Sequence, residues 1–198
     1  MKGFTLVELI VSIAIFAVMT ALVIARYGTF NQNTILTNMA YDMALTMRTA
    51  QTYGVSVKSA SVSGSADAFG SAYGIRFPSN DGASRTHFRL YSYSIGTDAS
   101  GQATYTADPQ PITTYTVTQG ATISQICFGT DPTQCTATKL VNSDQLDIIY
   151  RRPNPNAIFM VNNVSVVQPI AFISVTSQDG TKTETIYVRK NGQISVGN

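Results

Sequence analysis

Charged residues, histidine, cysteine and tryptophan are all scarce in this chain. Only 12% of its 198 residues are charged, one is histidine, two are cysteine and none is tryptophan. The chain therefore has very few side chains that could form a metal site or a catalytic centre built around histidine. We expect no metal, no cofactor and no enzymatic activity. The near balance of 13 basic and 11 acidic residues gives no bulk field that would select nucleic acid.

Apolar residues, in contrast, make up 44% of the chain, which is enough for one compact domain with an appendage. Ser and Thr replace the missing charge and supply 43 of the 198 positions. This composition favours β-structure with many hydroxyl-bearing surface strands.

A long uncharged run occupies the N-terminal region, from Leu9 to Ala25. Counted from Phe4 to Ala25, the segment would rise ~33 Å as a helix, enough to cross a hydrocarbon core of about 30 Å. We therefore expect a membrane-spanning helix, with the N-terminus inside.

Glu8 interrupts the apolar pattern near the start of this helix. A carboxylate at such a position costs up to a few kcal/mol on insertion, so it should have a partner or a function. The alternative is that Glu8 lies in the headgroup layer, where the positive end of the helix dipole favours it.

The residues around Glu8 resemble a known processing signal. Residues 1–10 read MKGFTLVELI, which is similar to the leader and helix start of type IV prepilins and type II secretion pseudopilins. The resemblance implies that prepilin peptidase cuts between Gly3 and Phe4 and that the new Phe4 amine is methylated. It also implies that Glu8 pairs with the Phe4 amine of a neighbouring subunit during assembly, which would satisfy both charges inside an apolar bundle.

Two other interpretations of the N-terminal segment stay open. An ordinary secretory signal peptide could be cut after the small residue Ala25, although Glu8 and the length of the apolar run argue against it. A plain single-pass anchor would need no cleavage at all.

Beyond Arg26 the chain turns amphipathic. Ile35, Met39, Met43 and Met47 recur every four residues and predict one apolar stripe on a helix. A helix from about Phe4 to Tyr53, stopped by Gly54, would be ~75 Å long. The expected organisation is a leader at 1–3, a spanning or filament-core helix at 4–26, an amphipathic half-helix at 27–54 and a head at 55–198.

Period-two alternation predicts strands in the head, and three turn pairs, Asp81-Gly82, Asp179-Gly180 and Asn191-Gly192, predict antiparallel neighbours. The predicted strands are 73–77, 86–94, 112–118, 123–128, 146–151, 170–176, 183–188 and 193–196. A helix followed by a run of strands indicates an α+β fold, in which the amphipathic half-helix packs on an antiparallel β head. The resemblance implies the same arrangement, the pilin fold.

Cys127 and Cys135 flank an Asp-Pro turn signal, and we predict a disulfide between them. Closing such a loop contributes about 2 to 3 kcal/mol and presupposes an oxidising, extracytoplasmic head. Two reduced thiols are the alternative.

Two basic pairs, Arg151-Arg152 and Arg189-Lys190, each end a predicted strand. We interpret them as solvated strand ends that protect sheet edges. The alternative is that they converge on one surface and hold DNA phosphates, as a DNA-capturing pilus-tip subunit would require.

Residues 185–196 resemble the closing hairpin of H-type minor pseudopilins and related minor pilins. Major pilins commonly have a proline in the outer part of the membrane helix and a cysteine pair near the C-terminus. This chain has no such proline, and 63 residues follow Cys135. We therefore expect a minor subunit of a type IV pilus or a type II secretion pseudopilus, inserted in the cytoplasmic membrane with its head outside. Its expected partners are prepilin peptidase and other pilin subunits, with DNA not expected; an anchored surface domain that never polymerises is a further alternative.

Overall fold

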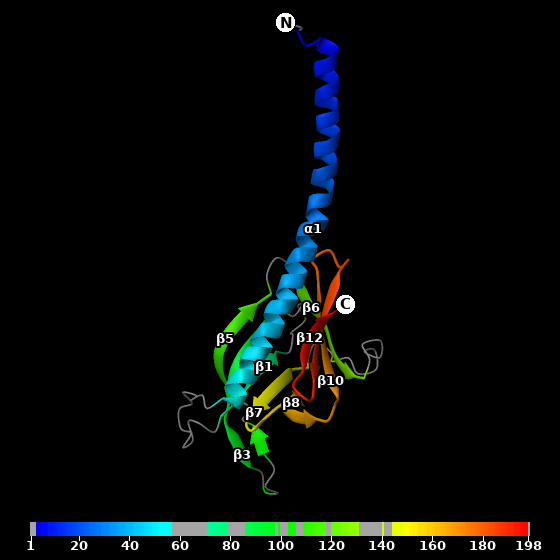
Figure 1. The fold of residues 1–198 in the computed structure, drawn as a ribbon. Coiled ribbons are helices and arrows are strands. Elements are labelled where there is room, and N and C mark those ends of the chain that lie inside the picture. Colours follow the sequence, from blue (N-terminus) through cyan, green and yellow to red (C-terminus); the bar gives the residue numbers. More distant parts are fainter. Residues whose placement is uncertain are drawn as a thin grey trace.

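The computed structural model consists of one long helix whose C-terminal half lies on a β head (Figure 1). It describes residues 3–56, 71–78, 86–97, 99, 103–105, 109–117, 120–130, 140 and 144–197, and the helix backbone without its side chains at 25–31. The helix, α1, runs without a break from Leu6 to Val55, two residues later at each end than the periodicity predicts. Its N-terminal half stands clear of the head (Figure 1).

The strands of the head follow α1 in the sequence. Their bounds are β1 Ala72–Phe77, β2 His87–Tyr93, β3 Ile95–Thr97, β4 Ala103–Tyr105, β5 Gln110–Thr116, β6 Thr122–Gly129, β7 Leu146–Arg151, β8 Asn154–Val161, β9 Val164–Val166, β10 Ile170–Thr176, β11 Thr183–Arg189 and β12 Ile194–Gly197. They form a six-stranded sheet of order β5-β2-β1-β7-β8-β9, a four-stranded sheet of order β12-β11-β10-β6, and a β3-β4 ribbon. Neighbouring strands pair antiparallel throughout these sheets, which confirms the expected α+β fold.

Four strands were missed by the pattern analysis: β3, β4, β8 and β9. Strand β8 begins with Asn154 and Pro155, residue types that normally argue against a strand. The turn from β8 to β9 places Asn162 at φ 50° and Asn163 at φ 65°, which makes this Asn pair a hairpin signal that the analysis overlooked. The expected turns at Gly180 and Gly192 are present with positive φ, whereas Asp81-Gly82 lies outside the described residues.

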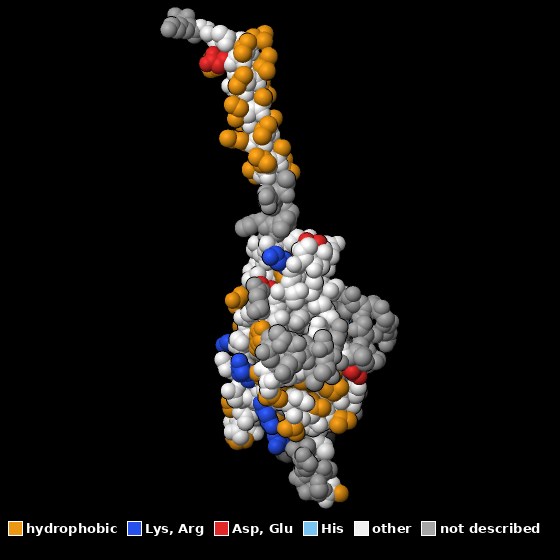
Figure 2. Space-filling view, turned by 90° about the vertical axis from the view of Figure 1, so that its right-hand side faces the viewer, with side chains coloured by type: hydrophobic (Ala, Val, Ile, Leu, Met, Phe, Trp, Pro, Cys, Tyr) orange, Lys and Arg blue, Asp and Glu red, His pale blue; other side chains and the backbone are white. Residues whose placement is uncertain are grey.

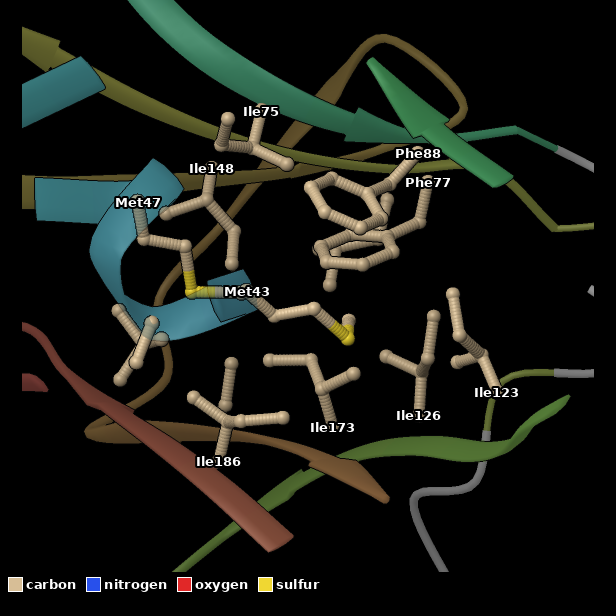
Figure 3. Close-up of a cluster of buried hydrophobic side chains, with 14 of the residues drawn as sticks. Met43, Met47, Ile75, Phe77, Phe88, Ile123, Ile126, Ile148, Ile173 and Ile186 are labelled. Atoms are coloured by element: carbon tan, nitrogen blue, oxygen red, sulfur yellow. The ribbon is translucent and has the colours of Figure 1, made fainter. Parts of the chain in front are cut away.

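The main core lies between the two larger sheets and α1. Figure 3 shows Met43 and Met47 of α1 between side chains of β1 and β7 on one side and side chains of β6, β10 and β11 on the other. Fully burying a methionine side chain contributes roughly 1.5–3 kcal/mol. Of the predicted stripe, Met43 and Met47 are buried and Ile35 and Met39 are half-buried, so this face of the helix does pack on the head. The neighbouring positions on the same face are also buried: Leu36, Ala40, Ala44 and Ala50.

The C-terminal end of α1 is fixed to the head by two close contacts. Gly54 lies so near the Tyr150 carbonyl that a Cβ at this position would collide with it. Gln51 Nε2 donates hydrogen bonds to the carbonyl oxygens of Pro155, at 3.0 Å, and Gly192, at 2.9 Å. One helix side chain therefore joins the β7–β8 and β11–β12 hairpins.

A buried ion pair lies on the face of the six-stranded sheet that points away from α1. Arg76 Nε and Nη2 donate to the two carboxylate oxygens of Asp147 at 2.7 and 3.0 Å. Tyr93 OH and Gln145 Nε2 donate to the same carboxylate at 3.1 Å each. The Arg76 guanidinium also lies over the Tyr91 ring, 5.1 Å from its centroid, so both charges are well partnered.

Candidate functional site

The described residues of the processing signal span the start of α1: residues 3–5 precede the helix and residues 6–10 lie within it. Thr5 is the N-cap, with extended backbone angles, and its side chain accepts a hydrogen bond from the Glu8 backbone N–H at 3.3 Å. Thr5 and Glu8 therefore occupy the two side-chain positions of a capping box, in which an acid at N3 suits the start of a helix. The Thr-x-x-Glu spacing is visible in the sequence, but the sequence analysis did not use it.

The bond between Gly3 and Phe4 is accessible in this geometry. Both residues precede the helix, and Phe4 is 78% exposed. A side chain built at Gly3 would meet no atom within 4 Å. A peptidase could reach this bond without unwinding α1.

The apolar half of α1 has no cover of its own. The stretch Leu6–Ile24 has a mean hydropathy of 2.6, and none of it is buried within the chain. Fourteen large apolar side chains between Phe4 and Ile24 are exposed. Figure 2 shows apolar side chains along the visible face of this part of the helix. At about 1.5 kcal/mol or more for each side chain, exposure to water would cost on the order of 20 kcal/mol, so this segment requires lipid or apolar surfaces of other chains.

Within the described apolar half of α1, the Glu8 carboxylate is the polar side-chain group that makes no hydrogen bond or ion pair with the helix. Ser12 and Thr20 donate their hydroxyls to the carbonyl oxygens of Glu8, at 2.7 Å, and Phe16, at 2.8 Å. No other charged residue occurs between Gly3 and Ala25. The exposed Glu8 carboxylate is therefore available for a cation that comes from outside this helix.

The two cysteines are placed only in part. Cys127 lies on β6, is fully buried and packs in a small cluster with Ile170 and Phe172. Cys135 lies in 131–139, outside the described residues. The disulfide between them stays a prediction.

Thiol titration of the unfolded, unreduced protein is expected to find no free cysteine, because a Cys127–Cys135 bridge would consume both thiols. The same titration after reduction with dithiothreitol should find two thiols and serves as the control. Two thiols before reduction would contradict the bridge.

Three of the four paired basic residues surround one hollow of about 260 Å³ in the head. Arg151, Arg152 and Lys190 line it together with Asn154 and Asn156. The fourth, Arg189, is exposed but does not line this hollow. The structure thus brings part of the expected cluster together.

His87, the single histidine, is the first residue of β2 and is half-buried. Within the described part of the chain, no group of three or more His, Cys, Asp or Glu side chains is arranged to hold a metal ion. The N-terminal end of α1 is therefore the candidate site with the clearest chemical purpose.

Comparison with known proteins bears on this same end of the chain. Residues 1–24 match the model of a family described as the prokaryotic N-terminal methylation motif. No curated protein and no solved structure shows significant similarity to the chain. The motif supports a type IV pilin-like prepilin, which implies processing by a prepilin peptidase and assembly with other pilin subunits, and it suggests a structural subunit and not an enzyme.

Proposed function

We propose, from the methylation motif and the uncovered apolar helix behind it, that this prepilin is a minor subunit of a type IV pilus or a type II secretion pseudopilus. It is inserted in the cytoplasmic membrane with its head outside, cut between Gly3 and Phe4, methylated at Phe4 and assembled with other subunits. The observation that supports this function best is the exposed carboxylate of Glu8 at the start of a helix that has no intramolecular cover.

Assembly explains more of this helix than anchoring does. An anchor needs only apolar length. In a plain anchor, Glu8 would raise the free energy of membrane insertion and would gain no interaction in exchange. In a bundle of such helices, the free amine at Phe4 of one subunit and Glu8 of another satisfy each other where water is absent. The apolar side chains around the whole circumference then contact neighbouring helices once the subunit has left the lipid.

The proposed organisation divides the chain into a leader at 1–3, a spanning and filament-core segment at 4–26, an amphipathic half-helix at 27–54 and a head at 55–198. A minor role is supported by the absence of proline from the whole of α1 and by the β11–β12 hairpin that closes the chain. The resemblance of this hairpin to H-type minor pseudopilins favours that subtype.

The mass of the protein extracted from membranes tests the processing step. We expect residues 4–198 with one added methyl group, because the Gly3–Phe4 bond is exposed and precedes the capped helix. The same protein from cells that lack prepilin peptidase should retain residues 1–198 and is the control.

Two other masses would contradict the proposal. A product of residues 26–198 would indicate an ordinary signal peptide and would remove the helix needed for assembly. An uncut chain in cells with active peptidase would indicate a plain anchor.

A further inference from the structure

We propose that the hollow lined by Arg151, Arg152 and Lys190 is a binding site for one compact oxyanion of the phosphate type. We call it the basic hollow. This binding activity goes beyond the role of a filament subunit, and it can be measured on the unassembled protein.

The basic hollow is built from two hairpins that hydrogen bonds hold together. Arg151 is the last residue of β7, and Arg152 follows it in the turn to β8. Arg151 is the strand partner of Asn154, next to a shift in the β7–β8 register. Lys190 belongs to the β11–β12 turn, and its carbonyl accepts a hydrogen bond from Ala157 N–H of β8 at 2.9 Å. Gln51 of α1 donates to both hairpins, so the backbone that positions the cations is fixed from three elements.

The lining of the basic hollow suits an anion. Three cationic residues line it together with Asn154 and Asn156, and among the described residues no acidic one lines it. Within the described residues, neither Arg151 nor Lys190 takes part in an ion pair. The remaining walls are Pro153, Ala157 and Ile158, whose apolar surface lowers the local dielectric and strengthens charge-assisted hydrogen bonds.

The size and place of the basic hollow indicate what kind of ligand fits. A hollow of about 260 Å³ has room for one compact group. It lies near the C-terminal end of α1, about 70 Å along the helix from Glu8. Figure 2 shows Lys and Arg side chains on the head, both near its top and along its lower edge, and apart from the apolar segment of the helix.

Charge also argues against a long polyanion as the ligand. The chain has a net charge of only +2, so it lacks the long-range attraction that speeds binding of nucleic acid. Three cations neutralise at most a few phosphates, which gives weak binding that fades quickly with salt. A single phosphate group uses the same cations at once.

The test is a titration of the full chain in nonionic detergent and phosphate-free buffer with inorganic phosphate, followed by the backbone amide resonances. We expect saturable shifts centred on Ala157 and Lys190. The double variant Arg151→Gln/Lys190→Gln should bind at least tenfold more weakly, because it loses two charge-assisted contacts. Arg189→Gln removes the same charge next to Lys190 but outside the lining, and should bind within twofold of wild type.

Further arms make the result decisive. Methyl phosphate in place of inorganic phosphate distinguishes an esterified group from the free ion, and binding of either at the same amides supports the site. Lys190→Gln alone, in an exposed turn, keeps the test valid if the double variant fails to fold. Shifts that do not saturate, or equal weakening by Arg189→Gln, would overturn the proposal. Micromolar binding of duplex DNA that is lost in the double variant would replace the compact ligand with a polyanion.

Discussion

Glu8→Val is expected to leave membrane insertion and leader cleavage intact while reducing incorporation into filaments by more than tenfold. Valine suits lipid at least as well as glutamate, so the free subunit should accumulate in the membrane. Inside a bundle, however, the valine variant offers nothing to the amine of a neighbouring Phe4, and that charge is left buried without a partner. Removing one member of a buried ion pair costs roughly 3–5 kcal/mol, which accounts for the size of the effect.

Sheared filament fractions, compared with membrane fractions by immunoblot, measure this outcome. Ser12→Ala is the matched control, because Ser12 is also polar and in the apolar half but already donates to the Glu8 carbonyl. Glu8→Gln separates the two roles of the residue, since glutamine keeps the capping-box position and loses the charge. Normal incorporation of Glu8→Gln would mean that capping, and not ion pairing, is the role of Glu8; normal incorporation of Glu8→Val would dismiss both.

Asp147→Ala is expected to lower the free energy of unfolding of the head by about 3–5 kcal/mol. The Asp147 side chain is 1% exposed and accepts hydrogen bonds from Arg76, Tyr93 and Gln145. Without it, the Arg76 guanidinium remains buried with no counter-charge. For a domain of this size, a loss of that magnitude is a large part of the total stability.

Urea unfolding of the full chain in nonionic detergent, followed by the near-ultraviolet signal of the tyrosines, measures the loss. Asp42→Ala removes an exposed carboxylate from α1 and should stay within about 0.5 kcal/mol of wild type. The double variant Arg76→Leu/Asp147→Leu should recover most of the stability, because it leaves no unpaired charge in the interior. An Asp147→Ala protein as stable as Asp42→Ala would contradict the buried pair.

Much of the fold follows from periodicity in the sequence. The four-residue spacing of Met39, Met43 and Met47 marks the face of α1 that packs on the sheets, and alternation marks strands such as β7 and β10 to within a residue or two. Both signals are local, because helices and strands present their side chains at fixed intervals. The T-x-x-E signal at Thr5 was equally local and could have been used.

Other features depend on contacts between distant segments. Arg76 is the one charged residue of β1 and Asp147 the one acidic residue of β7, and only the β1–β7 register, in which they are direct partners, brings them together. The basic hollow was foreseen as a possible convergence, yet Arg189 stays outside it while Lys190 lines it. Adjacent residues at the end of β11 point to different sides, which separates Arg189 from Lys190. Arg151 and Arg152, where β7 passes into its turn, both line the hollow.

The unbroken course of α1 has a mechanical consequence. A pull on the N-terminal end of the helix travels along one hydrogen-bonded rod to the half that is packed between the sheets. There the load acts in shear, along the whole Leu36–Ala50 contact and the Gln51 hydrogen bonds at once, and it does not peel away a single edge strand. The head is thus mounted so that tension along α1 is shared by many contacts.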